Sequence, residues 1–233
     1  MHSLDMFKEK MGRAADIRGR LYAYETIDPS RTALVVVDMQ NVFVARGQLV
    51  EVPEARDIVP NINALAAACR AAGMTVVWVQ HTVDKDAEQG WPIWFEFAMT
   101  PEQKPKYVEA MSAGSDGHAI YSELDVDERD VTVYKRRYSA FAEGASAIDT
   151  VLRERGIDSI ITTGTLTNVC CESSARDAYF KNYRIIFGSD ATACLTDEEH
   201  NASLLAVHNF FGDVRDTDEI LQALRDNEHR FPA

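Results

Sequence analysis

The chain has 233 residues, of which 46% are hydrophobic, so it is long enough to bury one sizeable core. Its formal net charge of -13 disfavours binding to nucleic acid or to an anionic membrane surface, because both would repel it. Its four cysteines show no Cys-x-x-Cys spacing and suit a reducing cytoplasm, where we expect the protein to be. We see no segment apolar enough to target or anchor the chain.

In chain order, short apolar runs rich in β-branched residues alternate with amphipathic segments. This alternation indicates a parallel sheet that is covered by helices on both faces. Right-handed crossovers then favour a three-layer α/β fold with a doubly wound, mainly parallel, Rossmann-like sheet. The expected strands cover residues 33–37, 75–80, 131–134, 159–163, 184–188 and 213–214, and the expected helices cover residues 56–72, 146–155, 175–180, 198–211 and 217–225.

No linker rich in glycine, serine or proline divides the chain. We therefore expect an amino-terminal arm over residues 1–28 and one domain over residues 29–228. Residues 83–122 fit the alternation badly, and an insertion of this length is usually a lid or an oligomer contact. Its aromatic residues, which include Trp94 and Phe97, either wall a pocket or bury against another subunit, and we favour the interface for most of them.

One turn places a cysteine where a nucleophile can be made. The run 159–163 predicts a buried strand and residues 175–180 predict a helix, so Cys170 lies at a strand-to-helix turn. Backbone N–H groups and the helix dipole stabilise a thiolate there, and such surroundings commonly lower a thiol pKa from roughly 8.5 toward neutrality. The position alone equally allows a small buried residue that packs the helix against the sheet.

Two predicted strands end on charged residues. Asp38 follows the apolar run 33–37, and Lys135 follows the run 131–134. Because open α/β sheets place their ligand crevice at the carboxyl ends of the strands, both side chains meet Cys170 there if their strands are neighbours. Asp38 can then take the thiol proton while Lys135 keeps the carboxylate ionised. Taken singly, the aspartate is more often a turn or cap residue and the lysine a solvated strand end.

Three separated motifs resemble those of the isochorismatase-like cysteine hydrolases. They read Val-Val-Val-Asp38-Met-Gln-Asn, Lys135-Arg-Arg-Tyr-Ser-Ala-Phe and Gly-x-x-Thr-Asn-Val-Cys170, in the family's order. The resemblance covers residues from about 28 to about 224, and its motifs are most similar to those of ureidoacrylate and N-carbamoylsarcosine amidohydrolases. It implies a Cys-Asp-Lys triad that cleaves the C–N bond of a small amide, ureido or carbamoyl substrate through a thioester. It implies no cofactor and no metal and, with the aromatic insertion, a homodimer or homotetramer.

The resemblance also implies an oxyanion hole. Members usually have a non-proline cis peptide that maps onto the Thr165–Leu166 bond. The backbone N–H groups of Leu166 and Cys170 would then face the oxygen on which negative charge develops. The adjacent Cys171 lies about 100° further round the helix, so we expect it to pack in the core.

Three more polar residues are expected near the same edge of the sheet. Asn41 lies three residues beyond Asp38, Tyr138 lies three residues beyond Lys135, and His81 ends the second strand. We predict that Asn41, His81 and Tyr138 contact the substrate, His81 by a hydrogen bond to a ureido or carboxylate group. A structural histidine and unliganded loop residues are the alternatives.

Other functions remain open from the sequence. The chain could be a catalytically idle binding or regulatory member of the same fold, with its aromatic insertion serving a partner. It could also be a metal-assisted amidase like the nicotinamidases, although residues 80–84 read Gln-His-Thr-Val-Asp and depart from the Asp-x-His metal signature of that group. A redox role for Cys170 and Cys171 is disfavoured, because adjacent cysteines pair only with strain.

Overall fold

The computed structural model describes residues 1–84 and 86–227. Its centre is a six-stranded sheet with the order β3-β2-β1-β4-β5-β6, in which every neighbouring pair is parallel. The strand order reverses between β1 and β4, which is where open α/β sheets bind ligands. The strands are β1 (Thr32–Val37), β2 (Thr75–His81), β3 (Val131–Lys135), β4 (Ser159–Thr165), β5 (Arg184–Ala193) and β6 (Asp213–Arg215).

Helices connect the strands, as the alternation predicts. A five-residue π-helical turn, η3 (Thr167–Cys171), joins β4 to the helix that follows it. The α-helices are α1 (Asp5–Lys10), α2 (Gly12–Arg18), α3 (Asn41–Val44), α4 (Val59–Ala71), α5 (Ala87–Gly90), α6 (Pro92–Ala98), α7 (Lys104–Met111), α8 (Ile148–Glu154), α9 (Glu172–Phe180), α10 (Asp197–Phe210) and α11 (Thr217–Asn227).

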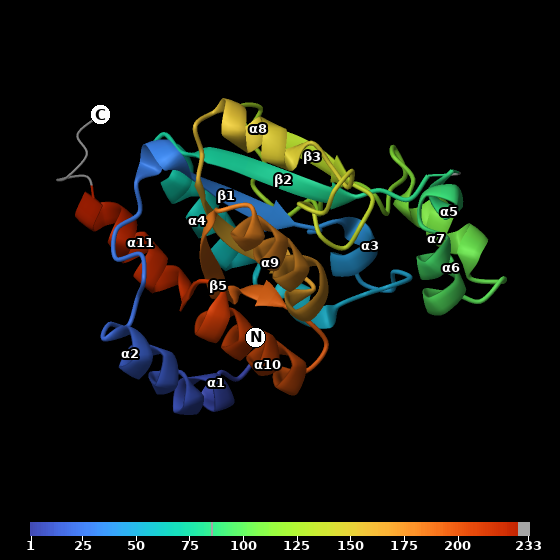
Figure 1. The fold of residues 1–233 in the computed structure, drawn as a ribbon. Coiled ribbons are helices and arrows are strands. Elements are labelled where there is room, and N and C mark those ends of the chain that lie inside the picture. Colours follow the sequence, from blue (N-terminus) through green and yellow to red (C-terminus); the bar gives the residue numbers. More distant parts are fainter. Residues whose placement is uncertain (85, 228–233) are drawn as a thin grey trace.

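Helices pack on both faces of the sheet (Figure 1). Successive residues of β1 point to opposite faces, because the side-chain period of a strand is two. Val35 and Val37 join the core that α8, α9 and α10 cover, and Leu34 and Val36 join the core that α4 and α11 cover. The predicted three-layer α/β fold with a parallel sheet is therefore confirmed.

Two predicted boundaries differ from the observed ones. The helix expected over residues 56–72 begins at Val59, because Pro60 is accommodated in the first turn of a helix and not in its interior. The strand expected over residues 184–188 continues to Ala193, with a register shift against β4 between Thr162 and Gly164. This extension was not predicted, because the polar residues beyond position 188 interrupt the apolar pattern.

The insertion over residues 83–122 lies beyond the carboxyl end of the sheet, to the right in Figure 1. It contains α5, α6 and α7, which pack around a third hydrophobic cluster that includes Trp94, Phe95 and Met111. Lys85 of the insertion lies outside the described residues. These short helices rest on the edge of the sheet where the predicted site residues gather.

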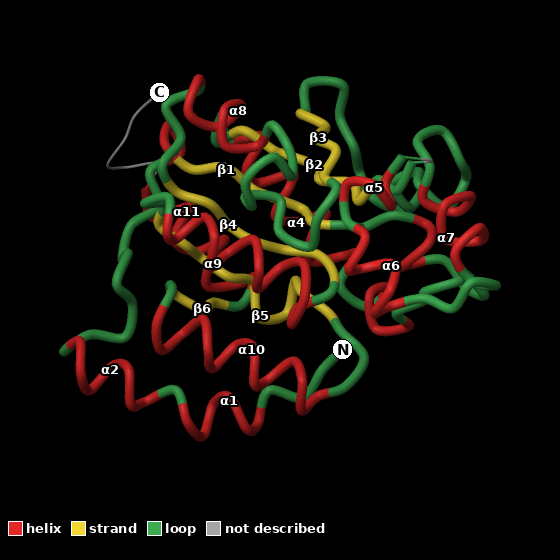
Figure 2. The backbone as a smooth tube through the Cα atoms, turned by 45° about the vertical axis from the view of Figure 1, so that its right-hand side comes forward, coloured by secondary structure: helices red, strands yellow, loops and turns green. Residues whose placement is uncertain are grey.

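The arm over residues 1–28 folds back on the domain. Its helices α1 and α2 run beside α10 (Figure 2), and Phe7 of α1 is buried there. The buried Asp213 carboxylate accepts hydrogen bonds from the backbone N–H groups of Ala23 and Tyr24. The expected domain end at residue 228 lies outside the described residues. No helix within residues 1–84 and 86–227 has the length and apolarity needed to cross a bilayer.

Candidate active site

Three charged or nucleophilic side chains converge at the carboxyl end of the sheet. Asp38 follows β1 directly, Lys135 is the last residue of β3, and Cys170 lies in η3 after β4. The sequence interpretation required neighbouring strands, but β2 lies between β1 and β3. The lysine still reaches the aspartate, because its long flexible stem extends past the end of the intervening strand.

The ammonium group of Lys135 is the centre of the cluster. Its Nζ lies 2.7 Å from Asp38 Oδ2 and 3.5 Å from Cys170 Sγ. It also donates hydrogen bonds to the backbone oxygen of Arg137 at 3.0 Å and to His81 Nδ1 at 3.1 Å. The Lys135 and Asp38 side chains are 0% and 1% exposed. The geometry therefore joins the three predicted triad members through one fully buried cation.

Burial dominates the electrostatics of this cluster. It raises the pKa of the Cys170 thiol, which the Lys135 charge lowers only in part. It also raises the pKa of the Asp38 carboxyl group against the opposing charge of Lys135. Burial lowers the pKa of Lys135, but the neighbouring Asp38 and Cys170 outweigh it and the pKa is raised. Burial therefore opposes the thiolate that the strand-to-helix turn is expected to favour.

Special backbone geometry brings the strand ends together. Asp38 has a positive φ of 51°, which is uncommon outside glycine and is found preferentially at functional sites. Gly164 has a φ of 108°, and a Cβ atom there would lie 2.0 Å from the backbone oxygen of Val37. Only glycine thus permits this approach of β4 to β1. The Thr165–Leu166 peptide is cis, as the resemblance implies.

A buried amide, not singled out from the sequence, aligns β1 with β2. Gln40 Oε1 accepts a hydrogen bond from the backbone N–H of His81 at 2.7 Å. Its Nε2 donates to the backbone oxygens of His81 and His118, at 3.1 and 2.9 Å. Gln40 therefore positions the histidine that contacts Lys135. The sequence signal that could have identified Gln40 is a glutamine two residues beyond Asp38, next to a buried strand.

A cavity of about 180 Å³ opens over the Cys170 sulfur. His81, Tyr138 and Leu166 line it together with Cys170, which places two of the three predicted substrate contacts in its wall. The insertion supplies much of the remaining wall, and Trp94 Nε1 donates a hydrogen bond to the Tyr138 hydroxyl at 2.7 Å. Further lining residues are Phe43, Val50, Trp94, Ala98, Tyr107 and Met111.

The comparisons with known proteins agree with this geometry. The Isochorismatase domain matches residues 32–219. The chain is 34% identical over 212 residues to the ureidoacrylate amidohydrolase RutB of Klebsiella variicola, covering 85% of this chain and 89% of that protein. The chain belongs to the isochorismatase family.

Solved structures of the same family share the fold. A cysteine hydrolase from Pseudomonas syringae superposes with a TM-score of 0.79 at 31% identity, covering 88% of this chain and 97% of that chain. An N-carbamoylsarcosine amidase from Thermoplasma acidophilum superposes with a TM-score of 0.65 at 29% identity, covering 81% and 97%. The chain is thus an isochorismatase-family hydrolase.

The structure places other predicted features of this isochorismatase-family site as follows. Asn41 is not among the residues that line the cavity, and its amide donates to the backbone oxygen of Asp116 at 2.9 Å, so its substrate contact stays a prediction. Trp94 and Phe95 are buried within the chain, whereas Phe97 is 90% exposed. Part of the insertion therefore forms the pocket wall, and the subunit interface expected for its aromatic residues stays a prediction.

One group of possible metal ligands occurs among the described residues, away from the catalytic cavity: His2, Cys194 and His200. The two imidazole rings stack, with centroids 4.4 Å apart and an interplanar angle of 18°. His200 Nδ1 accepts from Thr167 Oγ1, and its Nε2 donates to the backbone oxygen of Ser189, both at 2.9 Å. Lone pairs of stacked rings do not converge on one ion. His200 instead anchors η3, the turn that carries Cys170.

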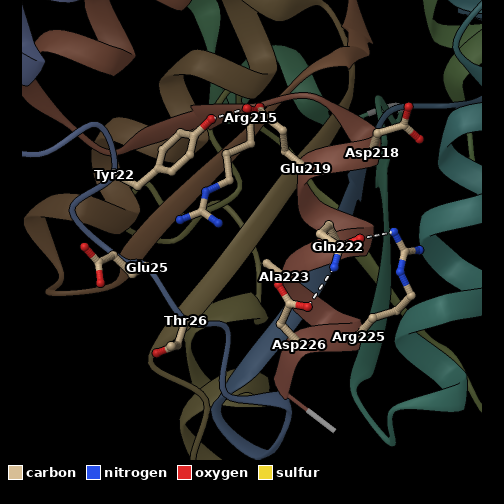
Figure 3. Close-up of a pocket in the computed structure, with 10 residues that line it drawn as sticks. All are labelled: Tyr22, Glu25, Thr26, Arg215, Asp218, Glu219, Gln222, Ala223, Arg225 and Asp226. Carbon is tan, nitrogen blue, oxygen red and sulfur yellow. Dashed lines mark hydrogen bonds between the residues drawn. The ribbon is translucent and has the colours of Figure 1, made fainter. Parts of the chain in front are cut away.

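A larger cavity of about 930 Å³ lies between the arm and α11 (Figure 3). None of the predicted site residues lines it. Some of its polar side chains bond one another: Tyr22 bonds Glu219, and Gln222 bonds both Asp226 and Arg225. The larger cavity of this isochorismatase-family chain therefore contains none of the residues from which the candidate site is built.

Proposed function

We propose that the protein is a cysteine-dependent amidohydrolase that cleaves the C–N bond of a small amide, ureido or carbamoyl substrate through a thioester. The observation that carries the proposal is the Cys170 sulfur at the floor of a cavity, 3.5 Å from the Lys135 Nζ that binds Asp38. The names of the relatives, ureidoacrylate amidohydrolase and N-carbamoylsarcosine amidase, support the type of bond.

In the first half-reaction, Asp38 takes the Cys170 proton as the sulfur attacks the carbonyl carbon. A general base assists this step, because burial raises the pKa of the Cys170 thiol. The raised pKa of Asp38 makes it a better proton acceptor than an exposed carboxylate. The carbonyl oxygen gains negative charge near the N–H groups of Leu166 and Cys170, and protonated Asp38 then gives its proton to the departing nitrogen.

In the second half-reaction, water replaces the amine. Asp38 takes a proton from the water while the water oxygen attacks the thioester carbon. The C–S bond then breaks. The acid leaves, and the proton returns to the Cys170 sulfur. Lys135 remains an ammonium group throughout and holds the Asp38 carboxylate at 2.7 Å. Each residue thus ends in the state in which it began.

The test is ammonia release from a panel of amides, ureido acids, N-carbamoyl amino acids, nicotinamide, biuret and maleamate. We expect Cys170→Ala to lower turnover by at least about 1,000-fold without changing the thermal midpoint by more than a few degrees. Cys171→Ala is the matched control, because that thiol is buried against the Thr163 backbone oxygen, 3.7 Å away. Undiminished turnover by Cys170→Ala would remove the sulfur from the mechanism.

Mass spectrometry of the intact protein distinguishes an enzyme from an idle binding member of the same fold. An accepted substrate should add its acyl group to wild-type protein at Cys170, and hydroxylamine should remove it. A member that only binds would show neither the adduct nor ammonia release with any compound of the panel.

A further inference from the structure

The catalytic cavity lacks formal charge. None of its lining side chains among the described residues belongs to lysine, arginine, aspartate or glutamate. Most of the wall is aromatic or aliphatic, with Phe43 and Val50 from the region after β1 and Trp94 and Met111 from the insertion. Such a wall favours an apolar body on the substrate.

The few polar side chains of this wall are uncharged. His81 Nδ1 lies 3.1 Å from the Lys135 Nζ, and a neutral imidazole keeps one ring N–H donor. Burial, and then the charge of Lys135, hold the pKa of His81 well below its usual value, so the ring stays neutral. The Tyr138 hydroxyl accepts from Trp94, which leaves its own proton available. Thr165 Oγ1 donates to the backbone oxygen of Ala193, so its proton is already used.

The nearest cations already have partners. Lys135 is fully buried and paired with Asp38, whose negative charge would repel a second carboxylate. Arg136 and Arg137 line a neighbouring cavity of about 170 Å³. Arg136 pairs with Asp84 at 3.1 Å, and Arg137 donates to the backbone oxygen of Gly90 at 2.6 Å. Among the described residues no cationic side chain lines the catalytic cavity itself, so a carboxylate there would lose its hydration without a cation in the cavity wall.

We propose that the preferred substrate is an uncharged primary amide or monosubstituted urea with a small apolar body, and that carboxylate-bearing analogues are discriminated against. This inference rests on the proposed amidohydrolase function. Neutral donors on His81 and Tyr138 can bind a carbonyl oxygen, and the volume of about 180 Å³ admits a short branched chain or a single ring. The site thus differs from one built for an acidic ureide such as the ureidoacrylate in the relatives' name.

Two isosteric pairs test the inference. Isobutylurea and N-carbamoylglycine differ by an isopropyl group against a carboxylate, and 4-methylpentanamide and succinamate differ in the same way. We expect kcat/KM for the neutral member to exceed that for the anion by at least about 100-fold, because an unpaired charge must be buried. Protection of Cys170 from iodoacetamide should follow the same order and reports binding even where turnover is slow. An anion that is turned over or bound as well as its neutral partner overturns the inference.

A cation placed in the wall should reverse part of this preference. Ala98 lines the cavity yet lies on the exposed side of α6, so a long side chain is tolerated there. We expect Ala98→Lys to reduce the neutral-to-anion ratio at least about 10-fold, while Ala98→Met, a neutral side chain of similar length, leaves it nearly unchanged. An equal change in both variants would also overturn the inference.

The two proposals fail in different ways. Wild-type preference for N-carbamoylglycine removes the inference about substrate class and leaves the amidohydrolase function standing. Hydrolysis of isobutylurea by Cys170→Ala removes the proposed mechanism, whatever the preference within each pair.

Discussion

The floor and the wall of the catalytic cavity are built differently. The floor is formed by Asp38, Lys135 and Cys170 at or after the ends of strands. Short contacts, such as the 2.7 Å ion pair of Asp38 and Lys135, fix its ionisable groups. Part of the wall consists of short helices from the insertion, which pack around an apolar cluster and include the hydrogen bond from Trp94 to Tyr138. The comparison suggests that floor changes remove turnover, whereas wall changes alter which substrate is used.

The largest effect is expected at the buried cation of the floor. Lys135→Met leaves the Asp38 carboxylate without a partner, so we expect kcat to fall at least about 1,000-fold and the free energy of unfolding to fall by about 3 to 5 kcal/mol. Steady-state kinetics and urea denaturation measure the two effects. Asp38→Asn combined with Lys135→Met should recover stability without recovering turnover, because it removes the uncompensated charge but not the need for a base. An active double variant would mean that the pair is structural only.

A second large effect is expected where two floor strands touch. Gly164→Ala would place a Cβ atom 2.0 Å from the Val37 oxygen and force β1 and β4 apart. Both turnover and stability should fall, turnover by about 100-fold or more, because small displacements of reacting groups are costly. Gly156→Ala is the matched control: its φ is 72°, but nothing lies within 4 Å of the added atom, so only about 1 kcal/mol of stability should be lost. Equal losses in both variants would show that positive φ, not the close approach, limits the site.

Acid should also weaken the contact of His200 with η3, the turn that carries Cys170. Burial lowers the pKa of His200 from 6.5 to about 4, so the folded state resists protonation of this ring. Its contribution is fully present above pH 6.5 and is lost as the pH falls toward 4, by up to about 3 kcal/mol at about 1.4 kcal/mol per pKa unit. Urea denaturation at pH 7.5 and 4.5 measures the loss. His200→Gln should show a smaller difference between the two pH values, and an unchanged difference would assign the pH dependence to other groups.

The residues of the floor could be predicted from the sequence, because each lies at a recognisable point of a local sequence pattern. Asp38 and Lys135 each end a β-branched run, and Cys170 follows a glycine that ends another. Parallel strands bring such ends to one edge of the sheet, whatever their distance along the chain. Neither the position of β2 between β1 and β3 nor the raised pKa of the Cys170 thiol was predicted. The first depends on strand order and the second on burial, and no single segment of the sequence determines either.

The residues of the wall could not be predicted from the sequence, because apolar residues show the same sequence pattern whether they face a pocket, a core or a partner. Trp94 and Phe97 lie three residues apart on α6, yet the former lines the cavity and the latter is 90% exposed. The helical period separates them only once the orientation of α6 is known. The hydrogen bond of Asn41 was unpredictable for a similar reason, since its partner Asp116 lies within the insertion.

The smallest effect is expected at the hydrogen bond between Trp94 of the wall and Tyr138. Tyr138→Phe removes the acceptor for Trp94 Nε1 and leaves a part-buried N–H group without its bond. We expect KM to rise about 5- to 10-fold, which corresponds to about 1 kcal/mol, with kcat nearly unchanged.

A double-mutant cycle with Trp94→Phe decides what Tyr138 does. If the tyrosine acts only by holding Trp94, its removal should have no further effect in the Trp94→Phe background. If its hydroxyl also binds the substrate carbonyl, a rise in KM should persist there, and Tyr138 would then belong to both the wall and the reacting centre.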